Sequence, residues 1–163
     1  PLPDYDFAGY KKITNSVGIK IIPSGNWVVD LQRFSEAIKN KIWSATRTDM
    51  AMIGGITNGK KAMEISEIGG LDCEIMSWGY TLVSVANLHL MLSSNICSFY
   101  EQPLPYETFE FGMNDVLRTS KDGYMYAPSK PGLGMEINWD KMKTKLIHTF
   151  YCDKNKKIGL VHS

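Results

Sequence analysis

Strand-like and helix-like segments alternate along residues 1–102, and successive strands lie about 25 residues apart. The strand-like runs are rich in β-branched and apolar residues, and the segments between them repeat apolar residues at helical spacing. Such a spacing holds one strand, one helix and short loops, which predicts parallel neighbouring strands joined by helices. The expected strands are 19–23, 43–52, 72–76 and 97–101, and the expected helices are 6–17, 28–40, 58–68 and 80–94.

Four strand–helix units predict an α/β fold that is half of a (β/α)8 barrel. A closed barrel takes about 250 residues and eight strands, whereas this chain has 163 residues. Half a barrel would leave two open strand edges and an uncovered interior. The chain also begins with Pro-Leu-Pro and has no Met before Met50. We therefore expect a fragment of a longer protein; a small doubly wound sheet is the structural alternative.

From Pro103 onward the sequence becomes rich in Pro, Gly and aromatic residues and loses any strong period. This composition predicts a long meander with short strands, and residues 148–163 are expected to be a frayed end. Large aromatic side chains need burial, so we expect the meander to wrap back over the molecule rather than to be disordered. The aromatic residues concerned are Phe109, Phe111, Tyr124, Tyr126 and Trp139.

Composition and charge argue against several classes of partner. The net charge is +1 with basic and acidic residues interspersed, so there is no basic stripe to neutralise a nucleic-acid backbone. The longest apolar stretch, 81–92, is interrupted by polar residues and is shorter than the ~20 residues that cross a bilayer. Three widely spaced cysteines form neither a disulfide framework nor a zinc motif. With no signal peptide visible, we expect a cytoplasmic protein that binds neither nucleic acid nor membrane.

Four segments carry a resemblance to a known family: RTDMAMIGGIT at 47–57, NLHLML at 87–92, SFYEQPLPY at 98–106 and APSKPGLGMEINWD at 127–140. In this order and spacing they resemble the mandelate racemase and muconate-lactonizing branch of the enolase superfamily. The resemblance implies the C-terminal half of a TIM-like (β/α)7β barrel. It divides the chain into 1–102, the second half of the barrel, and 103–163, a C-terminal meander that packs back on the barrel and on a capping domain.

The resemblance also implies a chemistry. In this family Mg²⁺ binds the substrate carboxylate, a base removes the adjacent α-proton, and the metal stabilises the enolate. We therefore expect a Mg²⁺-dependent lyase that dehydrates an acid sugar or hydroxy acid. The alternatives are a racemase or epimerase of a hydroxy or amino acid, and a non-catalytic barrel homologue with a decayed site. The expected partners are a small carboxylate substrate, the missing N-terminal half of the protein, and further copies in a homo-oligomer.

The metal ligand expected in this half departs from the family pattern. The family usually reads Gly-Glu-Asn at this strand end, whereas here the sequence is Ser24-Gly25-Asn26-Trp27. Gly25 stands at the ligand position and has no side-chain oxygen. Asn26 could offer its amide oxygen, which is a weaker, uncharged ligand for Mg²⁺. The alternative is a plain turn, because glycine adopts positive φ and asparagine tolerates it.

Asp49 and Glu101 are the candidate catalytic residues. Asp49 follows an expected strand, at the end where barrel enzymes place their active groups; its alternative role is to cap the Gly-Gly turn that follows. In the family this residue pairs with a His on the next strand, but Met76 occupies that position. The base is then a lysine of the missing half with Asp49 as its orienter, or the reaction has changed, or the site is degenerate. Glu101 matches a family glutamate that hydrogen-bonds the substrate carboxylate; its alternative is a surface acid.

Trp78 and Tyr80 follow the third expected strand and are the candidate substrate-binding residues. Their alternative role is packing, which is common for aromatic residues at strand ends. His89 lies within an apolar helix and is expected to be a buried histidine with its hydrogen bonds satisfied. Cys97 has no base or cationic neighbour in the sequence, which argues against a nucleophilic cysteine.

Overall fold

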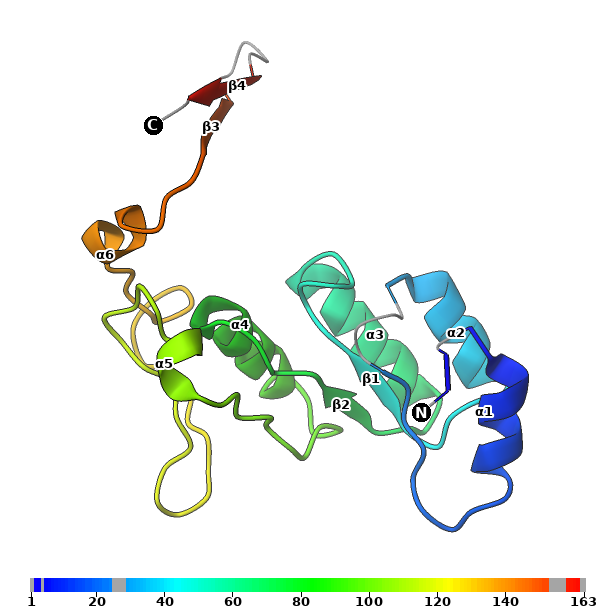
Figure 1. Cartoon of the computed structure of the whole chain (residues 1–163). Helices are drawn as coiled ribbons and strands as arrows, with labels where there is room; N and C mark the ends of the chain where they lie inside the picture. The colour runs from blue at the N-terminus through cyan, green and yellow to red at the C-terminus, as the bar shows by residue number, and fades with distance from the viewer. Residues whose placement is uncertain (1, 4, 25–28, 153–157, 162–163) are drawn as a thin grey trace.

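The computed structural model describes residues 2, 3, 5–24, 29–152 and 158–161, with side chains described up to residue 149. From α2 to α4 helices and strands alternate as expected, but no strand separates α1 from α2, and two short helices and a hairpin follow α4 (Figure 1). The elements are α1 (Phe7–Thr14), α2 (Leu31–Lys39), β1 (Thr46–Thr48), α3 (Ile56–Ile68), β2 (Cys73–Ile75), α4 (Thr81–Met91), α5 (Tyr106–Phe109), α6 (Trp139–Lys143), β3 (Thr149–Cys152) and β4 (Ile158–Val161).

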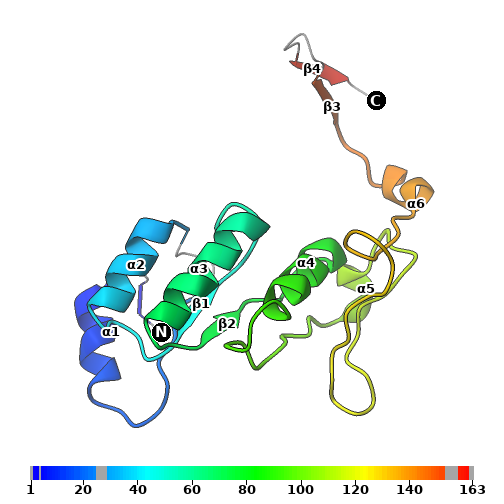
Figure 2. The ribbon, with the colours of Figure 1, turned by 180° about the vertical axis from the view of Figure 1, so that it is seen from behind.

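β1 and β2 lie at the centre of the fold and form a two-stranded parallel sheet. Thr46 pairs with Cys73 and Thr48 pairs with Ile75, and all four side chains are buried. Thr46 faces α3, because its Oγ1 lies 2.7 Å from Ser66 Oγ. Figure 1 and Figure 2 show α1, α2 and α3 grouped beside β1 and α4 beside β2. α3 and α4 also contact each other, with Leu90 of α4 against Gly59 of α3. The arrangement β1–α3–β2 is the predicted unit of two parallel strands joined by a helix.

The helices begin where local sequence supplies their first hydrogen-bond acceptors or a sharp turn. Asp6 accepts a hydrogen bond from the N–H of Gly9 at 2.8 Å and starts α1. Asp30 accepts one from the N–H of Arg33 at 2.7 Å and starts α2. Both are N-cap interactions, which satisfy N–H groups that have no partner within the helix. α3 instead follows the Gly54–Gly55 turn, where both residues have positive φ, 91° and 107°.

The two outer members of the four expected strands are not strands in the structure. Residues 19–23 lie beside β1, since the N–H of Ser44 donates to the carbonyl of Ile21 at 3.0 Å. Residues 97–101 lie beside β2, since the N–H of Cys73 donates to the carbonyl of Ile96 at 2.8 Å. Side-chain acceptors replace backbone acceptors on both flanks, so a regular ladder does not form. These acceptors are Ser44 Oγ for the N–H of Ile21, Glu74 Oε2 for those of Ser98 and Phe99, and Ser77 Oγ for that of Glu101.

The larger hydrophobic core surrounds Trp43, which is 2% exposed, between the first three helices and the sheet. Phe7, Tyr10 and Phe34 place their rings 5.9, 6.4 and 6.2 Å from the Trp43 ring. The first two contacts are edge-on, the geometry that aromatic quadrupoles favour. Through these contacts α1 and α2 pack on Trp43, which precedes β1 in the chain.

α4 is buried on nearly every side, as its apolar sequence predicts. Val85 and Leu88 pack against Leu117, Met125, Leu133 and Met135 of the segment after residue 103. The meander therefore does pack on the outside of α4. The division of the chain into domains at residue 102 stays a prediction.

Three of the five aromatic residues of the meander are exposed, and the expectation that they are buried was wrong. Tyr124 is 68% exposed, Tyr126 61% and Trp139 63%. Two of them compensate locally: their rings are 6.5 Å apart, and the hydroxyl of Tyr126 donates to Asp122 at 2.6 Å. Leu117, Met125, Leu133 and Met135 pack the segment on α4, whereas these three aromatic side chains face solvent.

α6 contacts the 111–113 segment, since the N–H of Asn138 donates to the carbonyl of Gly112 at 2.9 Å and Lys141 lies over the Phe111 ring. The β3–β4 hairpin stands away from the rest of the chain in both views (Figure 1 and Figure 2). β3 and β4 pair antiparallel, with Thr149 opposite Val161. The expectation of a frayed end was therefore wrong for the described part of this segment. Among the described residues, no helix combines the length and the hydropathy needed to cross a membrane.

Candidate active site

The carboxyl ends of β1, of β2 and of the segment beside β2 meet at one edge. Asp49 directly follows β1 and Met76 directly follows β2, and the N–H of Met76 donates to the carbonyl of Thr48 at 2.8 Å. Glu101 joins this edge through Ser77: its N–H donates to Ser77 Oγ at 2.6 Å, and that hydroxyl lies 3.3 Å from the Glu101 carbonyl. The fold thus places Asp49 and Glu101 at the same edge.

Asp49 is 3% exposed and is held by one of its two carboxylate oxygens. Its Oδ1 accepts hydrogen bonds from the N–H of Ala51 at 2.7 Å and from the Asn87 side chain at 3.3 Å. The first of these bonds caps the turn before Gly54, so the alternative predicted for Asp49 is realised in the structure. Its Oδ2 has no hydrogen-bond partner among the described residues. Capping therefore occupies one oxygen and leaves the other free, and the catalytic role of Asp49 stays a prediction.

Asn87 was not predicted as a site residue, although it reaches this edge from α4. It is fully buried, and its amide contacts both strand ends. The oxygen accepts from the N–H of Met50 at 2.9 Å, and the nitrogen donates to the carbonyl of Met76 at 3.1 Å as well as to Asp49. The signal available in the sequence was an uncharged amide in the middle of a largely apolar helix.

Glu101 forms an ion pair with Arg47, the middle residue of β1. The Glu101 side chain is 37% exposed and that of Arg47 is 20% exposed. Arg47 alternates with the buried Thr46 and Thr48, so it lies on the face of the sheet away from α3. Its Nε is buried and has no partner among the described residues. Glu101 is thus a partly buried, paired acid, and its contact with a substrate carboxylate stays a prediction.

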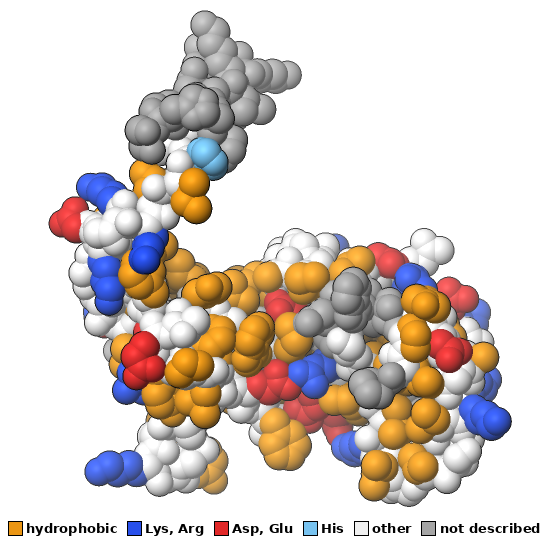
Figure 3. Space-filling view, in the orientation of Figure 1, with side chains coloured by type: hydrophobic (Ala, Val, Ile, Leu, Met, Phe, Trp, Pro, Cys, Tyr) orange, Lys and Arg blue, Asp and Glu red, His pale blue; other side chains and the backbone are white. Residues whose placement is uncertain are grey.

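Trp78 and Tyr80 both contact Phe109 of α5, with ring centroids 5.2 and 5.8 Å apart. They keep 51% and 62% of their surface exposed. Tyr80 also lines a groove of about 680 Å³ that runs to α6, whereas Trp78 does not. The face in Figure 3 shows hydrophobic side chains over this region and acidic and basic side chains near the centre of the molecule. The predicted packing role is realised for both residues, and their substrate contacts stay a prediction.

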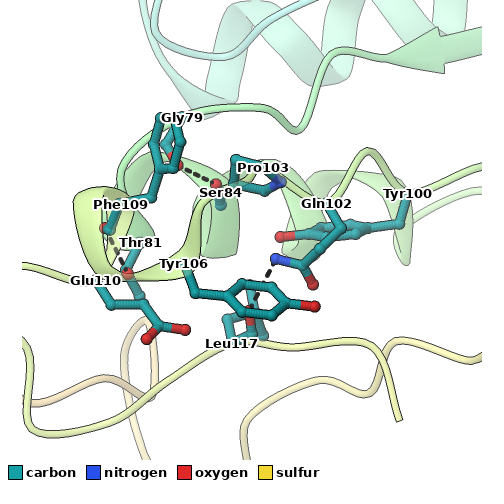
Figure 4. A pocket seen from close by; sticks show the side chains of 10 residues that line it. All are labelled: Gly79, Thr81, Ser84, Tyr100, Gln102, Pro103, Tyr106, Phe109, Glu110 and Leu117. Carbon is teal, nitrogen blue, oxygen red and sulfur yellow. Dashed lines mark hydrogen bonds between the residues drawn. The ribbon is translucent and has the colours of Figure 1, made fainter. Parts of the chain in front are cut away.

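A smaller pocket lies between α4, α5 and the 100–103 segment (Figure 4). Its volume is about 10 Å³, which holds roughly one water molecule. Burial raises the pKa of Tyr100, whose ring lines this pocket, to about 12. A carboxylic acid substrate is too large for this space, so the pocket is not a candidate for the substrate site.

The predicted metal position, Gly25 and Asn26, lies outside the described residues. Among those that are described, no three His, Cys, Asp or Glu side chains come together in a way that could hold a metal ion. The two acids at the strand-end edge do not substitute for such a group, because Glu101 is already paired with Arg47. The described residues therefore do not fit Mg²⁺ by themselves, and the roles assigned to them below do not pass through a metal. His89 is partly buried rather than fully buried as expected, and its Nε2 lies 3.2 Å from the carbonyl of Leu133.

The cysteines of the described core should be poor nucleophiles. Burial raises the pKa of Cys73 to about 11 and that of Cys97 to about 12. Because the thiolate is the reactive form, we expect both to react with iodoacetamide at pH 8 on the order of 10²-fold or more slower than an exposed cysteine of pKa about 8.5. Alkylation of the native protein followed by mass spectrometry measures each site, and the urea-unfolded protein is the control. Equal rates in the two states would contradict the prediction.

Comparisons with known proteins agree with this geometry. A family model described as enolase C-terminal domain-like matches residues 1–141. A D-galactonate dehydratase family member of Pantoea ananatis is 34% identical over 126 residues, which are 72% of this chain and 28% of that protein. A second such member, of Musicola paradisiaca, is 33% identical over the same shares. The chain thus spans about 28% of the length of the curated relatives it matches.

Solved structures show the same fold. The structure of a protein named as a mandelate racemase/muconate lactonizing enzyme from Pseudovibrio sp. matches the whole chain with a TM-score of 0.88 and 35% identity, over 41% of its own length. D-glucarate dehydratase of Agrobacterium tumefaciens, complexed with magnesium, matches 88% of the chain with a TM-score of 0.73. At 24% identity the second comparison supports the fold alone. The predicted fold class, part of an enolase-type α/β barrel, is confirmed.

Proposed function

Because this chain belongs to the mandelate racemase/muconate-lactonizing branch of the enolase superfamily, we propose that its full-length protein is a lyase that dehydrates an acid sugar or hydroxy acid. Its relatives include dehydratases and racemases. The reaction breaks the C–H bond next to the substrate carboxylate, and the proton passes to a base. The electron pair then forms a C=C bond as the β-hydroxyl group leaves, taking up a proton to become water.

The observation that carries this proposal is the carboxylate of Asp49 at the strand-end edge, with Oδ1 fixed by two donors and Oδ2 free of partners among the described residues. An acid with one fixed and one available oxygen can hold a basic group in place and stabilise its protonated form. We assign this orienting role to Asp49, with the base, a lysine, supplied from outside this chain. Glu101 and its partner Arg47 are assigned to the substrate carboxylate, with Arg47 supplying positive charge.

Met76 favours dehydration over racemisation. A two-base racemase needs proton-transferring groups on opposite faces of the α-carbon, and a methionine side chain cannot accept a proton at neutral pH. The same residue also supports the second candidate, a non-catalytic homologue. The ion pair of Glu101 with Arg47 supports that candidate too, because it occupies one of the two acids of the edge.

Several partners belong to the proposal. The full-length protein takes a small carboxylate substrate, contains an N-terminal half that completes the barrel, and assembles as a homo-oligomer. We propose Mg²⁺ as its metal, as the family resemblance implies, with ligands from outside the described residues; the D-glucarate dehydratase of similar fold is complexed with magnesium. We also propose a cytoplasmic location, supported by the free thiols of Cys73 and Cys97.

Proton exchange in D₂O tests the proposal. The full-length protein is incubated with a library of acid sugars and hydroxy acids, with and without Mg²⁺, and α-deuterium incorporation and dehydrated product are measured. We expect exchange and loss of water with at least one acid sugar, only when Mg²⁺ is present. Exchange with inversion but no dehydration would identify a racemase. No exchange with any compound would reject an enzymatic role and favour the non-catalytic homologue.

A further inference from the structure

The side chain of Asn87 is the physical link between the two strand ends of the candidate site. Three hydrogen bonds join it to three successive points of this edge: the N–H of Met50, the carbonyl of Met76 and the carboxylate of Asp49. It comes from the middle of α4, so the helix that covers β2 is tied to the end of β1. No solvent competes for these bonds, because Asn87 is fully buried.

These bonds use most of the hydrogen-bonding groups of the Asn87 side-chain amide. A primary amide has two N–H donors and an oxygen with two lone pairs, and here both N–H positions and one lone pair are directed at the strand ends. Two of the bonds go to backbone groups, the N–H of Met50 and the carbonyl of Met76. The third ends on a side chain, the Oδ1 of Asp49 at 3.3 Å.

The contact with Asp49 determines which of its oxygens is available. Oδ1 is approached by Ala51 N–H from the turn and by the Asn87 amide from the helix, which are two directions fixed by different elements. Rotation of the carboxylate would break both bonds. Oδ2 therefore keeps one orientation, as an orienting carboxylate requires.

We propose that Asn87 is a positioning residue for Asp49, which fixes the orientation of its free carboxylate oxygen and the spacing of the β1 and β2 ends. This inference rests on the proposed function. Asn87 does not itself face the substrate, because it is buried behind Asp49. Its loss should therefore lower kcat and leave KM nearly unchanged.

A double-mutant cycle on the full-length protein tests the proposal, with α-proton exchange as the readout. Asn87→Ala should lower kcat on the order of 10- to 100-fold, as misplacement of a catalytic group by about 1 Å does. In an Asp49→Asn background the same substitution should lower kcat less than about twofold, because the group that it positions is already lost. Asn87→Ser is the second variant, for use if the Asn87→Ala protein does not fold. A serine hydroxyl in a helix can donate its hydrogen bond to a backbone carbonyl of the preceding turn.

Ser66→Ala is the matched control, because Ser66 is also a fully buried polar side chain on a helix, bound to the opposite end of β1. It should change kcat less than about twofold in either background. A merely structural role for Asn87 predicts the same factor of loss with and without Asp49, and that result would overturn the inference. If the wild-type protein shows no exchange, the proposed function fails and the inference fails with it. Exchange in the wild type with independent effects of the two substitutions rejects the positioning role alone.

Discussion

Asp49→Asn should lower the rate of α-proton exchange by about 10²- to 10⁴-fold, the loss expected when an orienting carboxylate behind a base loses its charge. The substitution is chosen because Asn keeps an oxygen at the Oδ1 position. It can still accept the hydrogen bonds from Ala51 and Asn87 that cap the turn. Only the charge and the second carboxylate oxygen are lost, so the cap and the catalytic role are separated in one variant.

Two quantities are measured for each variant: kcat for α-proton exchange in D₂O, and the midpoint temperature of thermal unfolding. Asp72→Asn is the matched control: Asp72 precedes β2, and its carboxylate is paired with Lys20 at the amino end of the strands. At that end of a barrel acids contribute to stability rather than to chemistry, so exchange should change less than about twofold. If Asp49→Asn retains full exchange and an unchanged midpoint, the cap is the whole role of Asp49.

The arrangement of the central elements was predictable because it depends on periodicity, which is local. The expected helices at 28–40 and 58–68 correspond to α2 and α3, and the strands at 43–52 and 72–76 contain β1 and β2. The prediction of strands at 19–23 and 97–101 was wrong for a reason that periodicity cannot show. Whether a segment joins a ladder depends on which acceptor its N–H groups meet, and Ser44 and Ser77 present hydroxyl oxygens there instead of carbonyls.

The candidate site was predictable in position but not in its connections. Asp49 lies at the end of β1, and Glu101 lies at the end of the segment beside β2 that periodicity had marked as a strand. Their partners Asn87 and Arg47 are far away in the chain, and only the packing of α4 and the face alternation of β1 bring them in. A resemblance in short sequence motifs can identify the acidic residues of a site. The side chains that hold those acids in place can be identified only from the packed structure.

Leu90→Ala should destabilise the full-length protein by about 2–5 kcal/mol, the range for truncating a buried leucine. Leu90 is 2% exposed and packs from α4 against α3, where its Cδ2 would lie 2.6 Å from a Cβ placed on Gly59. Leu92→Ala is the matched control from the same helix end. Because Leu92 is 57% exposed, its truncation should change stability by no more than about 0.5 kcal/mol. Urea denaturation gives both values.

The contact with Gly59 predicts a reversal of sign that separates packing from helix propensity. Gly59→Ala alone should destabilise by about 1–2 kcal/mol, because Leu90 is held in the core and cannot yield to the added methyl group without strain. In the Leu90→Ala background the same change should stabilise by about 1 kcal/mol, since the methyl group enters the cavity and alanine is the better helix residue. In the Leu92→Ala background it should stay destabilising, because Leu92 leaves the contact intact. A Gly59→Ala effect of one sign in all three backgrounds would show that α3 and α4 do not meet at these two residues.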